Sequence, residues 1–179
     1  MKLRAATRAA HERVDRLGES FDLASPAGYR AFLRGHGAAL PGLERRLEAA
    51  GVGRLLSDWP SRRRTGVLLQ DLAAVAAAPP EPVASPDLHT RAQLMGALYV
   101  LEGSRLGGAY LRRRLAQSQP DAPAAYLAHG AGEPLWRTFV EWLGAQTPSP
   151  AEEATAIAAA DATFATFETG FRQAAREAA

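Results

Sequence analysis

Apolar side chains recur at three- and four-residue intervals along most of the chain, and this spacing predicts amphipathic helices. Over residues 3–17 the shared face holds Leu3, Thr7, Ala10, His11, Val14 and Leu17. With helix-start signals at Ser25–Pro26 and Ser149–Pro150, further helices are expected over 27–39, 41–50, 62–76, 88–117, 134–143 and 151–177. No stretch alternates as a strand does. The sequence therefore predicts an all-α protein of about seven to nine helices.

Size and composition fit one domain. With 179 residues and 47% hydrophobic content, the chain can bury one sizeable core, and we expect a single domain over residues 1–179. The absence of cysteine excludes disulfides and thiolate metal sites. No apolar run is long enough to cross a bilayer, and the N-terminus becomes charged too early for a signal peptide. We therefore expect a cytoplasmic protein without a membrane partner.

The charge pattern does not indicate nucleic-acid binding. The formal net charge is only +2, so the field of the whole molecule is weak. The basic run Arg62–Arg64 has no aromatic residues interleaved with it, and we expect it to be the solvated start of a helix.

The most unusual stretch runs over residues 97–113, where an apolar helical pattern contains Gly103, Gly107 and Gly108. Each glycine inside a helix lowers its stability by about 1 kcal/mol relative to alanine. Glycines kept at such a cost tend to occur at functional or strained sites. Gly96, Gly103 and Gly107 are seven and four residues apart and share one helix face. Such a face suits a flat ligand close to the backbone, close helix–helix packing, or a kink at the glycine pair.

His11 lies on, or at the edge of, the apolar face of the first expected helix. Asp15 follows one turn later, where it could accept a hydrogen bond from the second ring nitrogen, the usual support of a metal-bound histidine. Arg4 precedes His11 by two turns on nearly the same face and could meet an acidic group of a ligand. The alternatives are a core or boundary histidine and ordinary surface pairs at i,i+4.

Two other features have simpler interpretations. His36 lies between two glycines, and we expect it at the boundary or on the surface. Phe164, Phe167 and Phe171 are spaced three and four residues apart, which is typical of a stripe facing the core.

Two stretches, Thr7–Asp15 and Tyr99–Gly108, resemble the bacterial haem oxygenases, most of all the biliverdin-producing kind found with bacteriophytochromes. Residues 62–72 and the phenylalanine-rich last helix also look like that family, so the resemblance covers most of the chain. The string Glu-Gly-Ser-x-Leu-Gly-Gly is its most specific piece. The resemblance implies a single-domain helical bundle that holds haem between an N-terminal proximal helix and a glycine-rich, kinked distal helix.

The resemblance also implies a role for each candidate residue. These roles are the axial iron ligand for His11, its carboxylate support for Asp15, propionate contacts for Arg4 and Tyr99, the distal pocket for Gly103, Ser104, Gly107 and Gly108, and an apolar wall with a further cation for Phe167, Phe171 and Arg172. The haem itself would carry out the chemistry, and the protein would supply the ligand, the orientation and a distal space free of bulky side chains.

The implied activity is that of a haem-degrading monooxygenase. It would convert haem b to biliverdin, carbon monoxide and Fe2+ with molecular oxygen and an external reductant. The implied partners are a ferredoxin or flavoprotein reductase as electron donor, and a bacteriophytochrome that receives the product. Ser104 and Arg105 depart from the family, because some members carry an aspartate after the first distal glycine to order water.

Three rival interpretations stay open at this stage. A non-catalytic haem-binding or haem-sensing protein would use the same His11 ligation. A carboxylate di-iron oxygenase needs paired glutamate and histidine sets, which this sequence does not show. An interaction domain without a cofactor requires that His11 and the glycine face be buried against protein.

Overall fold

The computed structural model describes residues 2–178, and these residues contain helices and loops but no strand. The helices are α1 (Leu3–Ala6), α2 (Arg8–Glu19), α3 (Pro26–Ala49), the 3-10 helix η1 (Val52–Arg54), α4 (Trp59–Arg62), α5 (Thr65–Ala74), α6 (Arg91–Gly103), α7 (Arg105–Ser118), α8 (Ala125–Ala128), α9 (Leu135–Gly144) and α10 (Pro150–Ala178). The predicted all-α class is confirmed. Met1 and Ala179, the ends of the expected 1–179 domain, lie outside the described residues.

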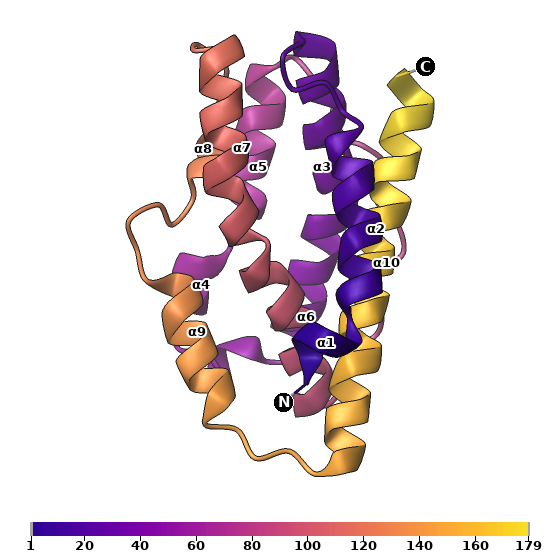
Figure 1. Ribbon diagram of the computed structural model, residues 1–179, viewed down its shortest axis with the longest axis vertical. Coiled ribbons are helices and arrows are strands. Elements are labelled where there is room, and N and C mark those ends of the chain that lie inside the picture. Colours follow the sequence, from indigo (N-terminus) through magenta and orange to yellow (C-terminus); the bar gives the residue numbers. More distant parts are fainter. Residues whose placement is uncertain (1, 179) are drawn as a thin grey trace.

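The two longest helices, α3 and α10, pack along each other and form the backbone of the core (Figure 1). Glycines allow this approach: a Cβ atom at Gly170 would lie 2.5 Å from the carbonyl oxygen of Gly35. Helix α6 packs on the other part of α10. Leu33, Leu40 and Leu98 are fully buried between these helices.

Helix α3 runs through Pro41, so the expectation of a separate helix over 41–50 is wrong. A proline inside a helix removes one hydrogen bond and costs about 3 kcal/mol. Leu40 and Leu43 on either side are completely buried, and we attribute the continuity of α3 to the apolar surface that both halves bury together. Tertiary packing thus overrides the local breaking signal.

Two other helix boundaries differ from the expectation. The N-terminal helix divides at Thr7, whose buried side chain donates to the carbonyl of Leu3. Helix α6 begins only at Arg91, behind a capping box formed by Thr90 and Gln93. Side-chain-to-backbone hydrogen bonds lie at both boundaries, that of Thr7 at the end of α1 and the capping box at the start of α6.

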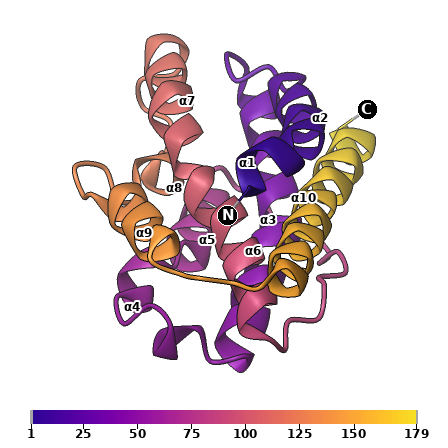
Figure 2. The same ribbon diagram turned by 60° about the horizontal axis from the view of Figure 1, so that its bottom comes forward.

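The long central helix is interrupted at Ser104, between α6 and α7. The break therefore falls after the first glycine of the motif, and α7 continues through the pair Gly107–Gly108. Beyond the break, α7 and α2 lie on either side of a space that no ribbon crosses (Figure 2). No helix among residues 2–178 is long and apolar enough to span a membrane.

Candidate functional site

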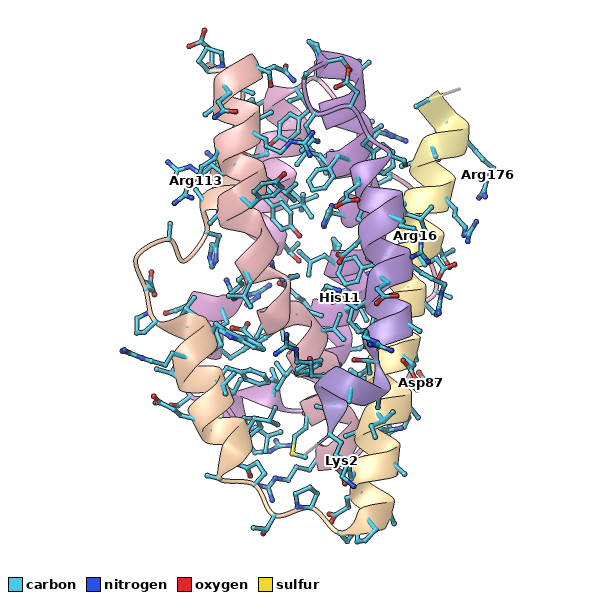
Figure 3. All side chains as sticks on the ribbon, in the orientation of Figure 1. Lys2, His11, Arg16, Asp87, Arg113 and Arg176 are labelled. Carbon is cyan, nitrogen blue, oxygen red and sulfur yellow. The ribbon has the colours of Figure 1, made fainter. Side chains whose placement is uncertain are left out.

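His11 is accessible on α2 and already has a carboxylate partner. Its Nδ1 atom lies 2.8 Å from Oδ2 of Asp15, and both side chains are more than half exposed. The ring also makes an edge contact with Phe164 of α10, with 5.6 Å between ring centroids. Because Nδ1 is engaged, Nε2 is the nitrogen left for an outside ligand, as a metal-bound histidine requires. Figure 3 shows His11 on the side of α2 that faces α6 and α7.

The structure also brings Arg4 and Tyr99 together from distant parts of the sequence. Burial raises the pKa of the half-buried Tyr99 hydroxyl, while the positive charge of Arg4 and the side chain of Thr7 act to lower it. Arg4 itself is exposed. Arg4 thus lies close enough to the Tyr99 hydroxyl for its charge to act there, and together the cation and the phenol could receive an anionic group.

The glycines of the central stretch fall into two groups. A Cβ atom at Gly96 would lie 2.0 Å from the carbonyl oxygen of Ala156, and one at Gly108 would lie 3.1 Å from that of Leu127. Close packing therefore explains these two glycines. A Cβ atom at Gly107 would meet nothing within 4 Å, and one at Gly103 would touch only Trp136 at an ordinary 3.7 Å. The neighbouring protein does not require glycine at these two positions.

Large apolar side chains surround the unexplained glycines without being covered. Leu106 and Tyr110 are 61% and 60% exposed, and they lie on the same side of α7 as Gly107. We call Gly103, Leu106, Gly107 and Tyr110 the glycine face. In Figure 2 the gap between the ribbons separates α7 from α2, the helix that carries His11. The arrangement suits a flat, apolar ligand with an axial ligand on one side.

Ser104 is tied into the break rather than directed into the open space. Its hydroxyl donates to the carbonyl of Leu101 and accepts a 3.0 Å hydrogen bond from Nη2 of Arg64. Behind the break lies a cavity of about 40 Å³, into which Arg64, Ser104, Arg105 and two histidines contribute polar atoms. Its size and lining suit a few ordered waters.

The expectation of a solvated basic run over Arg62–Arg64 is wrong for two of its three members. Arg62 and Arg64 are 2% and 4% exposed, and only Arg63 lies outside. Arg62 binds Asp58 and the buried carboxylate of Glu102, and its hydrogen bonds hold the pKa of Asp58 below its usual value. Arg62 and Arg64 are buried because they form hydrogen bonds with carboxylates and carbonyls of other helices. The sequence next to the run does not reveal these partners.

His36 lies at the boundary of the core, in line with the expectation, because the residue is only partly exposed. Its Nδ1 atom lies 3.0 Å from the carbonyl of Phe32, and its ring contacts Tyr126, Phe167 and Phe171. Burial lowers the pKa of His36 to about 4, and nearby Arg64 acts in the same direction. His36 is therefore neutral at ordinary pH, with Nε2 free to accept a hydrogen bond.

The candidates from the last helix lie apart from the glycine face. Phe167 and Phe171 are buried in the core, as their spacing indicates, with Phe171 packed against Gly35 of α3. Arg172 is exposed and binds Glu168, which also accepts from Arg13 of α2. Among residues 2–178, no group of three or more histidine and acidic side chains forms a metal site.

Sequence reasoning did not identify Glu102, Arg62, Arg64 and His129 as parts of the site's surroundings. Glu102 was visible as a charged residue within an apolar helical pattern, which is a signal for a buried ion pair. The others carry no such signal: apart from Asp58, which pairs with Arg62 at i,i+4, their partners in side-chain hydrogen bonds lie 20 or more residues away in sequence.

Comparisons with known proteins agree with this geometry. A family model described as "Heme oxygenase" matches residues 68–173, a span that includes the glycine face and ends before the last residues of α10. A curated protein from Xanthomonas campestris named "Heme oxygenase" is 38% identical over 144 residues, which cover 79% of this chain and 87% of that protein.

Two solved structures share the fold. The NO- and CO-bound haem oxygenase from Neisseria meningitidis superposes with a TM-score of 0.84 at 27% identity, covering 97% of this chain and 89% of that one. Haem oxygenase from Leptospira interrogans superposes with a TM-score of 0.73 over 96% of this chain and 97% of that one, and at 16% identity it supports the fold alone.

Proposed function

Because this chain belongs to the haem oxygenase family, we propose that it degrades haem to biliverdin, carbon monoxide and Fe2+ with molecular oxygen and an external reductant. One observation carries the proposal: a Cβ atom at Gly107 would meet no described part of the protein within 4 Å, and the accessible His11 lies on α2, across the gap between the ribbons from α7. Haem is the flat, apolar molecule that needs both features.

In this proposal each side of the ligand has its own residues. Nε2 of His11 binds the iron, while Asp15 holds Nδ1 and so fixes the ring. Arg4 and Tyr99 receive the carboxylates at the haem edge, as their charge and hydroxyl permit. Leu106 and Tyr110 add apolar contact on the side of α7.

The glycine face would act mainly by leaving space. Haem supplies the iron that binds oxygen and the meso carbon that is oxidised. Because Gly103 and Gly107 carry no side chain, a haem bound on this face would meet no side chain from these two positions. Gly108 and Ser104 support the face from behind, through the contact with Leu127 and the hydrogen bond from Arg64. The cavity behind them can hold water close to the reacting side.

Further details belong to the same proposal. We take the substrate to be haem b, the protein to work as one domain over residues 1–179 in the cytoplasm, and the electrons to come from a ferredoxin or a flavoprotein reductase. A bacteriophytochrome would receive the biliverdin. Phe167, Phe171 and Arg172 have little part in this version, because their contacts are with the protein core and with Glu168.

The proposal is tested by titrating the purified protein with haemin and following the absorbance. We expect a Soret band that saturates at one haem per chain. Ascorbate or a ferredoxin system in air should then convert that band into the spectrum of biliverdin. A stable complex without decay would leave the non-catalytic haem-binding protein, and no specific complex would mean that only the fold is shared.

His11→Ala separates the site from unspecific haem adsorption. Removal of the axial ligand should abolish the complex or weaken it by about a hundredfold, because an iron–imidazole bond is lost. His89→Ala is the control, since His89 lies before α6 and lines a surface depression with Arg46 and Leu88. Equal loss in both variants would contradict the assignment of His11.

A further inference from the structure

At the break between α6 and α7, side chains form hydrogen bonds with a backbone carbonyl that would be bonded within a continuous helix. At Leu101 the backbone oxygen accepts from Nη2 of Arg64 at 2.8 Å and from the Ser104 hydroxyl at 2.8 Å. A cation at the C-terminal end of α6 also opposes the negative end of the helix dipole. Arg64 thus caps the helix that ends at the break.

Glu102, two residues before the break on α6, joins Arg62 of α4 to Arg105 of α7. Its Oε2 atom accepts from Nη1 of Arg62 at 2.5 Å and from Nε of Arg105 at 2.9 Å. Its Oε1 atom accepts from Nη2 of Arg105, also at 2.9 Å. The Glu102 side chain is 1% exposed, and those of Arg62 and Arg105 are 1% and 8% exposed. We call Arg62, Glu102 and Arg105 the junction clamp.

Arg62 has no unused donor. Besides Glu102, it donates twice to Asp58 and once each to the carbonyl of Leu135 and the hydroxyl of Thr138. The five N–H groups of a guanidinium are thereby all satisfied. The clamp therefore fixes α6 relative to α4 and α9, and not only relative to α7.

Arg105 carries the connection into α7. It donates to the carbonyl of Arg62, and its Nη1 atom lies 3.1 Å from Nδ1 of His129. Burial and the two arginines Arg105 and Arg64 lower the pKa of His129, so that its ring is neutral and can accept this bond. Arg105 is thus committed to the clamp.

A buried ion pair is a poor source of stability, because desolvation offsets most of the attraction. Its better-attested use is to specify one arrangement among several of similar energy. Here the alternatives are other angles between α6 and α7, since Gly103, Gly107 and Gly108 leave the backbone free to bend. The residues of the junction clamp surround the break at which the angle between α6 and α7 is set.

We propose that the junction clamp positions the glycine face, by fixing the angle of α7 to α6 and hence the distance between Gly107 and the haem. This inference rests on the proposed function for its ligand. Glu102 is a positioning residue in this scheme, because it touches neither haem nor iron and acts through Gly103 and the first turn of α7.

Glu102→Gln tests the proposal in the haem-free protein by hydrogen exchange. The amide loses one charge but keeps its shape, so both arginines become underpaired. The backbone amides of Gly108 to Leu111 should exchange about tenfold faster, while those of α3 and α10 keep their protection. Glu177→Gln is the matched control, since Glu177 accepts two hydrogen bonds from Arg34 on the opposite part of the molecule.

A second readout uses the ferric haem complex. In Glu102→Gln the distance between the glycine face and the haem should change. The pH at the midpoint of the pH-dependent change in the haem absorbance spectrum should then move by about 0.5 unit or more, with no shift in Glu177→Gln. Arg105→Lys keeps the charge and loses the paired donors, so it should shift the midpoint in the same direction by less. If Glu102→Gln does not fold, Arg105→Lys takes its place in both the hydrogen-exchange and the pH-midpoint experiments.

The proposal is overturned if exchange at Gly108 to Leu111 stays as in the wild type, or if protection falls equally throughout the chain. The latter result would mean that the clamp serves stability alone. A wild-type protein that fails to bind haem would refute the proposed function, whereas the exchange experiment would still decide whether the clamp holds the break.

Discussion

Gly96 and Gly107 lie in the same central stretch, eleven residues apart, yet their surroundings are opposite. A methyl group at Gly96 would lie 2.0 Å from the backbone oxygen of Ala156, whereas one at Gly107 would meet nothing within 4 Å. The first belongs to a sealed region, where α6 packs on α10. The second belongs to an open region, which we define by the glycine face and His11.

This difference shows that glycine occurs at the two positions for two different reasons. In the sealed region glycine is required by the fold, because two helix backbones touch. In the open region the fold would accept alanine, and glycine is retained at a local cost of about 1 kcal/mol per residue. A position that sacrifices helix stability without a packing reason is a good candidate for function. The comparison can be tested by substitutions on each side.

The largest effect is expected from Gly96→Ala in the sealed region. The added carbon collides with backbone rather than with a movable side chain, so α6 and α10 must separate. We expect a loss of about 3 kcal/mol in the free energy of unfolding, measured with urea. Gly66→Ala is the control, since Gly66 on α5 is exposed and has nothing within 4 Å of the added carbon. Similar stability of both variants would refute the sealed interface.

His36, which is partly buried, should make stability depend on pH. Its pKa is about 4 in the folded protein and about 6.5 in the unfolded chain, so the unfolded state binds the extra proton between these values. The contribution is fully present above pH 6.5 and is lost as the pH falls toward 4, up to about 3 kcal/mol. Urea unfolding of wild type and His36→Gln at several pH values checks this, because the variant should lose that slope. Parallel pH curves would contradict it.

In the open region, Asp15→Asn should weaken haem binding about tenfold, because the asparagine no longer holds the His11 ring as a charged acceptor. Protein stability should change little, since both side chains are more than half exposed. Haemin titration measures the effect. Glu12→Gln is the control on the same helix, where Glu12 pairs only with Arg8. Equal affinities of the two variants would remove Asp15 from the site.

The sharpest contrast between stability and activity is expected from Gly107→Ala. The fold has room for the methyl group, so stability should rise by about 1 kcal/mol. Haem degradation should nevertheless slow, because the methyl group points into the space proposed for the ligand. Thermal unfolding and biliverdin formation measured on one preparation test both statements. A stabilised variant with full activity would show that the open glycines do not line the haem site.

The sequence alone determined the helical class, most helix positions and the candidates His11, Asp15 and Gly103 to Gly108. Local rules suffice there, because the period of apolar residues defines a helix face and i,i+4 spacing places Asp15 beside His11. The same rules placed Phe167 and Phe171 in the core, where they are found. They could not distinguish the packing glycines from the open ones, because the two kinds are identical along the chain.

Only the tertiary structure decided which helix faces are covered. The continuation of α3 through Pro41, the aromatic contacts of His36 and the burial of Arg62 each depend on residues far away in the sequence. Such contacts carry no local signature, since a side chain's partner across the fold leaves no period or spacing in the sequence around it. The open space at Gly107 is decided in the same way, by the absence of a neighbour among the described residues.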